Sequence, residues 1–148
     1  MTNRFLLFSF LIFVVSCSKE SVDEYATGNT YSGIVGKWKL IETRNDNGAG
    51  DEHIIDKSSE NYIMTFESTG KVRAPGFLCD GEYSFTPKPV EEMRGANLVI
   101  SFDCNLLPDN IETTPGRYYA VITDYNYLSM SNESCDETCA RVFRRLKE

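Results

Sequence analysis

The feature that most constrains the fold of this chain is a series of short apolar runs that begins near Val35. In several of these runs apolar and polar residues alternate, as Trp38 and Leu40 alternate with Lys37 and Lys39. A period of two places the apolar side chains on one face of a β-strand. Gly, Pro, Asn or Asp separates one run from the next, so the pattern predicts strands joined by turns.

Eight strands are predicted, and no helix of ordinary length, although 91–94 fits a single helical turn. The strands are expected at 36–44, 61–67, 71–74, 79–85, 97–103, 117–123, 127–131 and 140–146. Short links favour an all-β, antiparallel up-and-down barrel, since eight strands can close and remove their exposed edges. A two-sheet sandwich remains an alternative, because strand spacing does not distinguish the two. The segments 45–59 and 105–116 are predicted to be irregular loops.

Charge and composition exclude several classes of function. The 148 residues indicate one domain, and the formal net charge of −7 disfavours nucleic acid as a partner. His53 is the only histidine, and no pattern assembles a nucleophile, a base and an orienting acid. The segment 45–50 resembles a calcium loop but departs from that pattern at Ala49, so we interpret it as a turn. We therefore predict a monomeric protein that is not an enzyme and has no cofactor or metal.

The first sixteen residues are predicted to be a lipoprotein signal peptide. The apolar run 5–15 is shorter than the roughly 20 residues that span a bilayer, and it ends at Val14-Val15-Ser16-Cys17, which resembles a bacterial lipobox. That resemblance implies cleavage before Cys17 and a lipid such as palmitate on its thiol. An ordinary signal peptide is the alternative. Residues 17–32 are then the lipidated cysteine and a flexible tether, and residues 33–148 are the folded domain. Ser18 is compatible with delivery to the outer membrane, on either face.

Four more cysteines follow, and an even number in an exported chain indicates two disulfides. Cys79 begins one predicted strand and Cys104 ends the next, so an antiparallel pair brings them to the same end. Cys135 and Cys139 flank the last hairpin turn. We predict the bridges Cys79–Cys104 and Cys135–Cys139. A four-cysteine zinc site is the alternative, but it requires a second close pair of ligands.

Five short segments together resemble the lipocalin-like domains of small Bacteroidetes lipoproteins. They are Gly36-Lys37-Trp38-Lys39-Leu40, Phe66-Glu67-Ser68-Thr69-Gly70-Lys71-Val72, Gly81-Glu82-Tyr83, Tyr127-Leu128-Ser129-Met130 and Val142-Phe143-Arg144-Arg145-Leu146. The resemblance covers about residues 33 to 147. It implies that a basic residue of the last strand, here Arg145, packs over Trp38 and closes one end of the barrel.

A lipocalin-like barrel implies a pocket for a small hydrophobic ligand at the opposite mouth. The aromatic residues expected to line it are Tyr62, Phe66, Tyr83, Phe85 and Phe102. The alternative is that these rings fill the barrel. The protein would then be a scaffold at the cell surface that contacts a protein or glycan through its loops.

Overall fold

The computed structural model describes residues 24–28, 33–46, 51–87, 96–104, 115–135 and 139–148. Cys17 and the possible helical turn at 91–94 lie outside this part of the chain, as does most of the predicted loop 105–116. The strands are β1 (Gly36–Asp46), β2 (Glu52–Asp56), β3 (Ile63–Phe66), β4 (Lys71–Arg73), β5 (Gly81–Phe85), β6 (Leu98–Ser101), β7 (Gly116–Thr123), β8 (Tyr127–Asn132) and β9 (Cys139–Arg145). A 3-10 turn, η1, spans Ser58–Glu60.

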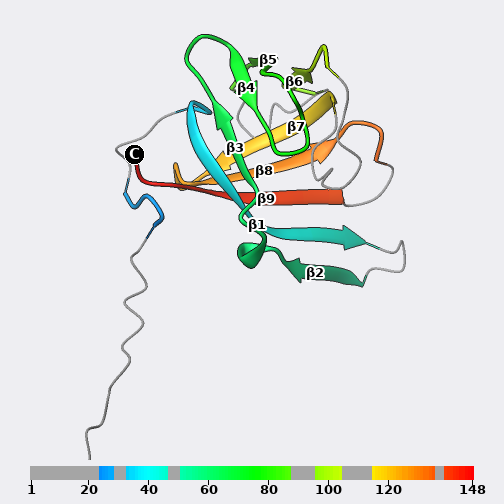
Figure 1. Cartoon of the computed structure of the whole chain (residues 1–148). Helices are drawn as coiled ribbons and strands as arrows, with labels where there is room; N and C mark the ends of the chain where they lie inside the picture. The colour runs from blue at the N-terminus through cyan, green and yellow to red at the C-terminus, as the bar shows by residue number, and fades with distance from the viewer. Residues whose placement is uncertain (1–23, 29–32, 47–50, 88–95, 105–114, 136–138) are drawn as a thin grey trace, which may run out of the picture.

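Eight of these strands form a closed antiparallel barrel (Figure 1). Each strand from β3 to β8 pairs with the next along the chain, and β1 pairs with both β3 and β9. This neighbour-to-neighbour order is the up-and-down topology predicted from the short links. The prediction of a barrel is confirmed. The two-sheet sandwich is excluded because β1 pairs with both β3 and β9 and so closes the sheet.

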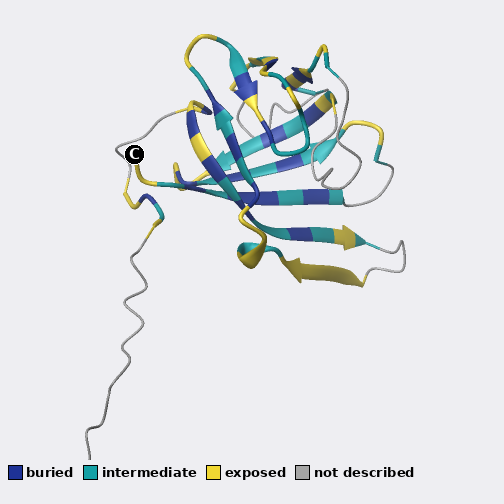
Figure 2. Ribbon diagram, viewed as in Figure 1, coloured by how far each residue is buried: buried dark blue, intermediate teal, exposed yellow. Residues whose placement is uncertain are grey.

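Strand β2 lies outside the barrel, and here the prediction of an irregular loop over 45–59 was wrong. A bulge between Leu40 and Glu42 shifts the register of β1 against β9. Beyond this bulge, β1 pairs with β2 on the side where its first half pairs with β3. All five residues of β2 are exposed (Figure 2), so no alternation of apolar residues was required in its sequence. Backbone pairing to β1 alone defines this strand.

The barrel interior contains alternate residues of several strands, as the sequence pattern predicted. Val72 of β4 is fully buried, and Tyr83 and Phe85 of β5 pack against the same core. The buried hydrophobic residues of this core are Ile34, Trp38, Leu40, Tyr62, Met64, Phe66, Val72, Ala74, Leu98, Ile100, Tyr118, Ala120, Leu128, Met130 and Phe143. Removing these side chains from water is the main stabilising term of the fold.

Residues 24–28 differ from the flexible tether expected for 17–32, because they are hydrogen-bonded to the barrel. Tyr25 forms a bridge with Leu146, and the backbone N–H of Ala26 donates to the carbonyl of Arg145 at 2.9 Å. Ala26 is only 2% exposed. The ordered domain therefore begins at or before Glu24, which a polar segment without periodicity did not indicate.

Candidate functional site

At the end of the barrel where β1 begins, the side chain of Arg145 lies over the indole ring of Trp38. The guanidinium carbon is 4.1 Å from the ring centroid, and the two residues are 1% and 0% exposed. This is the cation–π arrangement that the family resemblance implied for these two residues. The indole Nε1 also donates to the carbonyl of Ile34 at 2.7 Å.

The same guanidinium binds three backbone carbonyls from two separate segments. Its Nη2 donates to Gly33 at 2.6 Å, its Nη1 to Val35 at 2.5 Å, and its Nε to Tyr125 at 3.1 Å. Arg145 thus fastens the segment before β1 and the β7–β8 turn to one end of the barrel. We call this the closed end, and the role of Arg145 there is structural.

Gly36 makes this close approach possible. Its φ of +131° is unfavourable for a residue with a side chain, and a Cβ at this position would lie 2.8 Å from Nη1 of Arg145. The glycine of the Gly-x-Trp pattern is therefore explained by the guanidinium that packs against it.

The aromatic residues predicted to line a pocket do not gather at one mouth. Phe66 pairs with Gly36 at the closed end. The ring of Tyr83 contacts Phe66 edge-on with centroids 4.9 Å apart, and its hydroxyl donates to the carbonyl of Glu67 at 2.8 Å. Burial raises the pKa of the Tyr83 hydroxyl above its ordinary value. These two rings pack against each other and the turn that follows β3.

The other predicted pocket residues are also packed. Tyr62 is 5% exposed, and Phe85 packs against the buried core. Phe102 follows β6 and stacks on Phe77 with ring centroids 3.6 Å apart. A Cβ on Gly81 would lie 2.6 Å from the ring of Phe102, so this glycine provides the space that the ring occupies.

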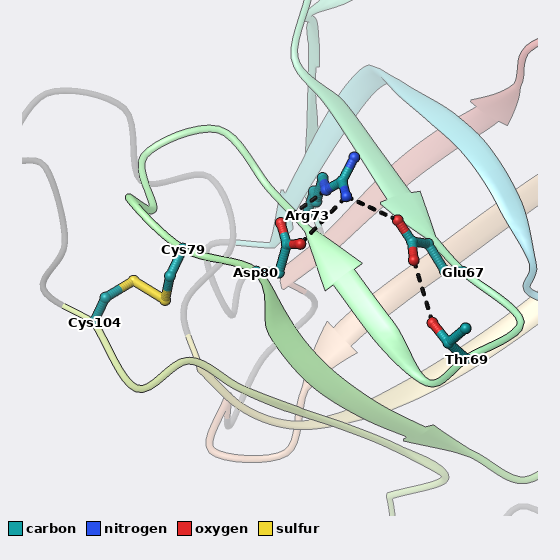
Figure 3. Close-up of polar contacts among 6 residues, drawn as sticks. All are labelled: Glu67, Thr69, Arg73, Cys79, Asp80 and Cys104. Atoms are coloured by element: carbon teal, nitrogen blue, oxygen red, sulfur yellow. Dashed lines mark hydrogen bonds and ion pairs between the residues drawn. A yellow bond between two sulfur atoms is a disulfide. The ribbon is translucent and has the colours of Figure 1, made fainter.

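Both predicted disulfides are present, and both lie away from the closed end. Cys79 and Cys104, with Cα atoms 6.0 Å apart, join the segment before β5 to the segment after β6 (Figure 3). Cys135 and Cys139, with Cα atoms 6.2 Å apart, join the end of the β8 hairpin turn to the start of β9. The two pairings are confirmed, and the four-cysteine zinc alternative is excluded because these thiols are used.

A polar cluster lies beside the first disulfide. Arg73 donates to both carboxylate oxygens of Asp80, at 2.7 and 3.2 Å, and contacts Glu67, which accepts from the hydroxyl of Thr69 (Figure 3). The hydrogen bond from Arg73 holds the pKa of Asp80 below its ordinary value. The charges of this cluster already satisfy one another at an exposed surface, so it offers little to a ligand.

Several hollows lie on the described surface, and two of them flank β1 and the β7–β8 turn. The first, about 260 Å³, lies where β1 leaves the barrel, and Lys57 at its edge pairs with Glu60 at 2.7 Å. It is lined by Thr43, Asn45, Ile55, Lys57, Cys139, Ala140 and Arg141. The second, about 480 Å³, lies beside the β7–β8 turn, and we call it the turn hollow. It is lined by Ala26, Thr27, Gly28, Asp124, Tyr125, Asn126, Tyr127 and Arg144.

The turn beside this second hollow has an unusual backbone. The N–H of Asn126 donates to the carbonyl of Thr123 at 3.2 Å, and the two residues between them have φ values of +48° and +60°. These values define a type I′ turn, which Asn-Gly favours because glycine adopts positive φ without strain. Here Asp124 and Tyr125 occupy the two positions, and the Tyr125 side chain is exposed.

Arg144 forms one wall of the turn hollow and faces outward, between the inward side chains of Phe143 and Arg145. Its guanidinium carbon is 4.3 Å from the ring centroid of Tyr25 and 5.6 Å from that of Tyr127. Among the described residues it makes no ion pair or side-chain hydrogen bond, and neither does Asp124 in the same hollow. Two aromatic rings thus hold a cation that has no anionic partner in the described part of the chain.

The sequence predicted only a turn at Asp124–Asn126 and assigned no role to Arg144. Tyr25 precedes Arg144 by more than a hundred residues, so no local pattern connects them. The available signal was a bulky residue in a short hairpin turn where glycine is usual.

In the described part of the chain, no three His, Cys, Asp or Glu residues lie close enough to bind a metal ion. No helix of that part is long and apolar enough to cross a bilayer. Comparison with known proteins finds no matching family, no similar curated protein and no similar solved structure.

Proposed function

We propose that this chain is a lipoprotein of the cell envelope whose barrel is a filled, rigid scaffold that acts through its outer surface. The observation that carries the proposal is the packing of the interior, to which all eight barrel strands contribute side chains. Eight-stranded barrels have room either for packed side chains or for one small ligand. The alternative function, a carrier of a small hydrophobic ligand, needs space that these side chains occupy.

Two sequence features support an envelope location. The lipobox-like residues that end at Cys17 favour lipid attachment, and two acyl chains anchor a protein stably where one chain does not. The disulfides favour an oxidising compartment. We propose the outer membrane as the destination, and a lipid-anchored monomer as the form of the protein.

Metabolic labelling with an alkynyl palmitate tests the anchor. The wild-type chain is expected to carry the label and to be recovered in the membrane fraction. The Cys17→Ala variant is expected to lose the label. Ser18→Ala, which leaves the cysteine in place, is the matched control and should label normally. Labelling of Cys17→Ala at the wild-type level would refute the lipoprotein assignment.

Titration of the purified full chain with the fluorescent probe N-phenyl-1-naphthylamine tests the filled interior. We expect no saturable binding. Saturable one-to-one binding would instead support the hydrophobic carrier if Tyr83→Ala changes it and Tyr119→Ala, on the outer face of β7, leaves it unchanged. Tyr83 suits this test because its side chain is only partly buried.

A further inference from the structure

The turn hollow carries hydrogen-bonding groups that have no partner among the residues that the structure describes. Arg144 is a donor and Asp124 is an acceptor, yet the two form no ion pair although both line the hollow. A third group, Asn126, donates through Nδ2 to the carbonyl of Gly28 at 2.7 Å, while its Oδ1 has no partner among the described residues. A wall with both unpaired donors and unpaired acceptors is complementary to a ligand that can accept and donate.

We propose that the turn hollow binds a neutral, polyhydroxylated sugar unit of a glycan; this rests on the proposed action through the outer surface. A hydroxyl group accepts from a guanidinium and donates to a carboxylate, so neighbouring sugar hydroxyls satisfy both Arg144 and Asp124. An anion is repelled by Asp124 and by the net charge of −7, and a cation is repelled by Arg144. A neutral ligand with several hydroxyls avoids both penalties.

The backbone strain at Tyr125 supports a binding role for its ring. A non-glycine residue at positive φ is destabilising, and such residues cluster at functional sites. The Tyr125 side chain is nevertheless 51% exposed, so about half of its surface faces solvent and can contact a ligand. Its face carries partial negative charge and is suited to stack against the C–H groups of a sugar ring.

The size of the hollow fits such a ligand. Its volume of about 480 Å³ lies within the usual range for small-ligand sites. A neighbouring hollow of about 430 Å³ shares Asp124 and Tyr127 with the turn hollow and extends to Val142 of β9 and Ser129 of β8. The two form one groove on the outer surface of the barrel, which accommodates more than one sugar unit.

The immobilised guanidinium also favours recognition over random contact. Arg144 is held by the rings of Tyr25 and Tyr127, and Tyr25 is held by its backbone bridge to Leu146. Because the donor is already fixed, less conformational entropy is lost when a ligand binds.

The test uses the full chain in lauryldimethylamine oxide micelles, a detergent without sugar, on an array of neutral and acidic oligosaccharides. The strongest neutral oligosaccharide is then titrated by calorimetry. We expect Arg144→Met and Tyr125→Gly each to weaken binding at least tenfold. The matched controls Arg117→Met and Tyr119→Ala, which alter the outer face of β7 away from the hollow, should change affinity less than twofold.

Tyr125→Gly separates a binding role from a structural one. Glycine relieves the positive φ and keeps the carbonyl that accepts from Arg145, so the melting temperature should rise by a few degrees while binding is lost. Unchanged oligosaccharide affinity in Tyr125→Gly would overturn the proposal. A fall in melting temperature would also count against it, because the ring would then be structural.

Asp124→Asn distinguishes a neutral sugar from an anion. Loss of the charged acceptor should weaken binding of the neutral oligosaccharide, since charge-assisted hydrogen bonds are the stronger ones. If inorganic phosphate or acidic glycans bind instead, and Asp124→Asn strengthens that binding, the hollow is an anion site and the proposal is wrong. Failure of every oligosaccharide to bind also refutes it, and neither result alters the palmitate or interior-probe tests of the proposed function.

Discussion

Replacement of Arg145 by methionine tests the closed end of the barrel. Methionine keeps much of the side-chain volume but removes the guanidinium, and leaves the carbonyls of Gly33, Val35 and Tyr125 without this donor. Hydrogen bonds from a charged donor contribute about 1.5–3 kcal/mol each, and the cation–π contact with Trp38 about 0.5–2 kcal/mol. The desolvation cost of the buried cation, several kcal/mol, offsets part of this sum. We therefore expect a net loss of about 3–5 kcal/mol.

The adjacent Arg144→Met provides the matched control. Arg144 also contacts aromatic rings, but on the outer surface and without hydrogen bonds, so its loss should cost about 1 kcal/mol. Urea unfolding under oxidising conditions, followed by tryptophan fluorescence, measures both variants. A slope of about 2 kcal/mol per molar predicts that Arg145→Met lowers the midpoint by about 2 M. A loss no larger than that of Arg144→Met would refute the structural role assigned to Arg145.

Three further predictions follow from the same structure. Gly36→Ala should lower the free energy of unfolding by about 1–3 kcal/mol, because it adds positive-φ strain and displaces the Arg145 guanidinium. The same urea titration measures this loss, and an unchanged midpoint would contradict the close packing. Removing the bridge between Cys79 and Cys104, which are 25 residues apart, should cost about 3 kcal/mol of stability. Removing the bridge between Cys135 and Cys139, which are 4 residues apart, should cost less. Equal losses in thermal unfolding would argue against loop entropy as the cause. The hydrogen bond from Lys39 lowers the pKa of Glu24 below its ordinary 4.5, so this pair stabilises the fold above that pH, and the contribution is lost as pH falls through the lowered pKa. Glu24→Gln should therefore reduce the melting temperature slightly at pH 7 and not at pH 2. An equal reduction at both pH values would contradict the ion pair.

The strands that could be predicted from the sequence are those with one buried and one exposed face. In β1, Trp38 and Leu40 are fully buried and Lys37 is exposed, so alternation in the sequence mirrors alternation in burial. Strand β2 exposes both faces, and its Glu-His-Ile-Ile-Asp sequence therefore carries no alternation to detect. Its place beside β1 depends on the bulge after Leu40, which a binary pattern of apolar and polar residues does not reveal.

The candidate site was less predictable than the fold. The sequence suggested aromatic residues as a ligand pocket, but an inward-facing ring is equally consistent with a packed core. Only the burial of Phe66 and Tyr62 in the folded structure separates the two. Arg144 and Arg145 are neighbours in sequence, yet one faces the outer groove and the other the closed end. Strand geometry requires that split, but the surroundings of each side chain depend on distant segments.

The sequence by itself therefore determined the all-β class, the eight barrel strands and the two disulfide pairings. Each depends on local alternation, on turn residues, or on cysteines at the ends of adjacent strands. Only the tertiary structure decided that residues 24–28 join the domain, that β2 lies outside the barrel, and that Arg144, Asp124 and Tyr125 surround one hollow. The physical reason is that burial pattern is a property of neighbouring residues, whereas a surface site arises where segments far apart in the chain meet.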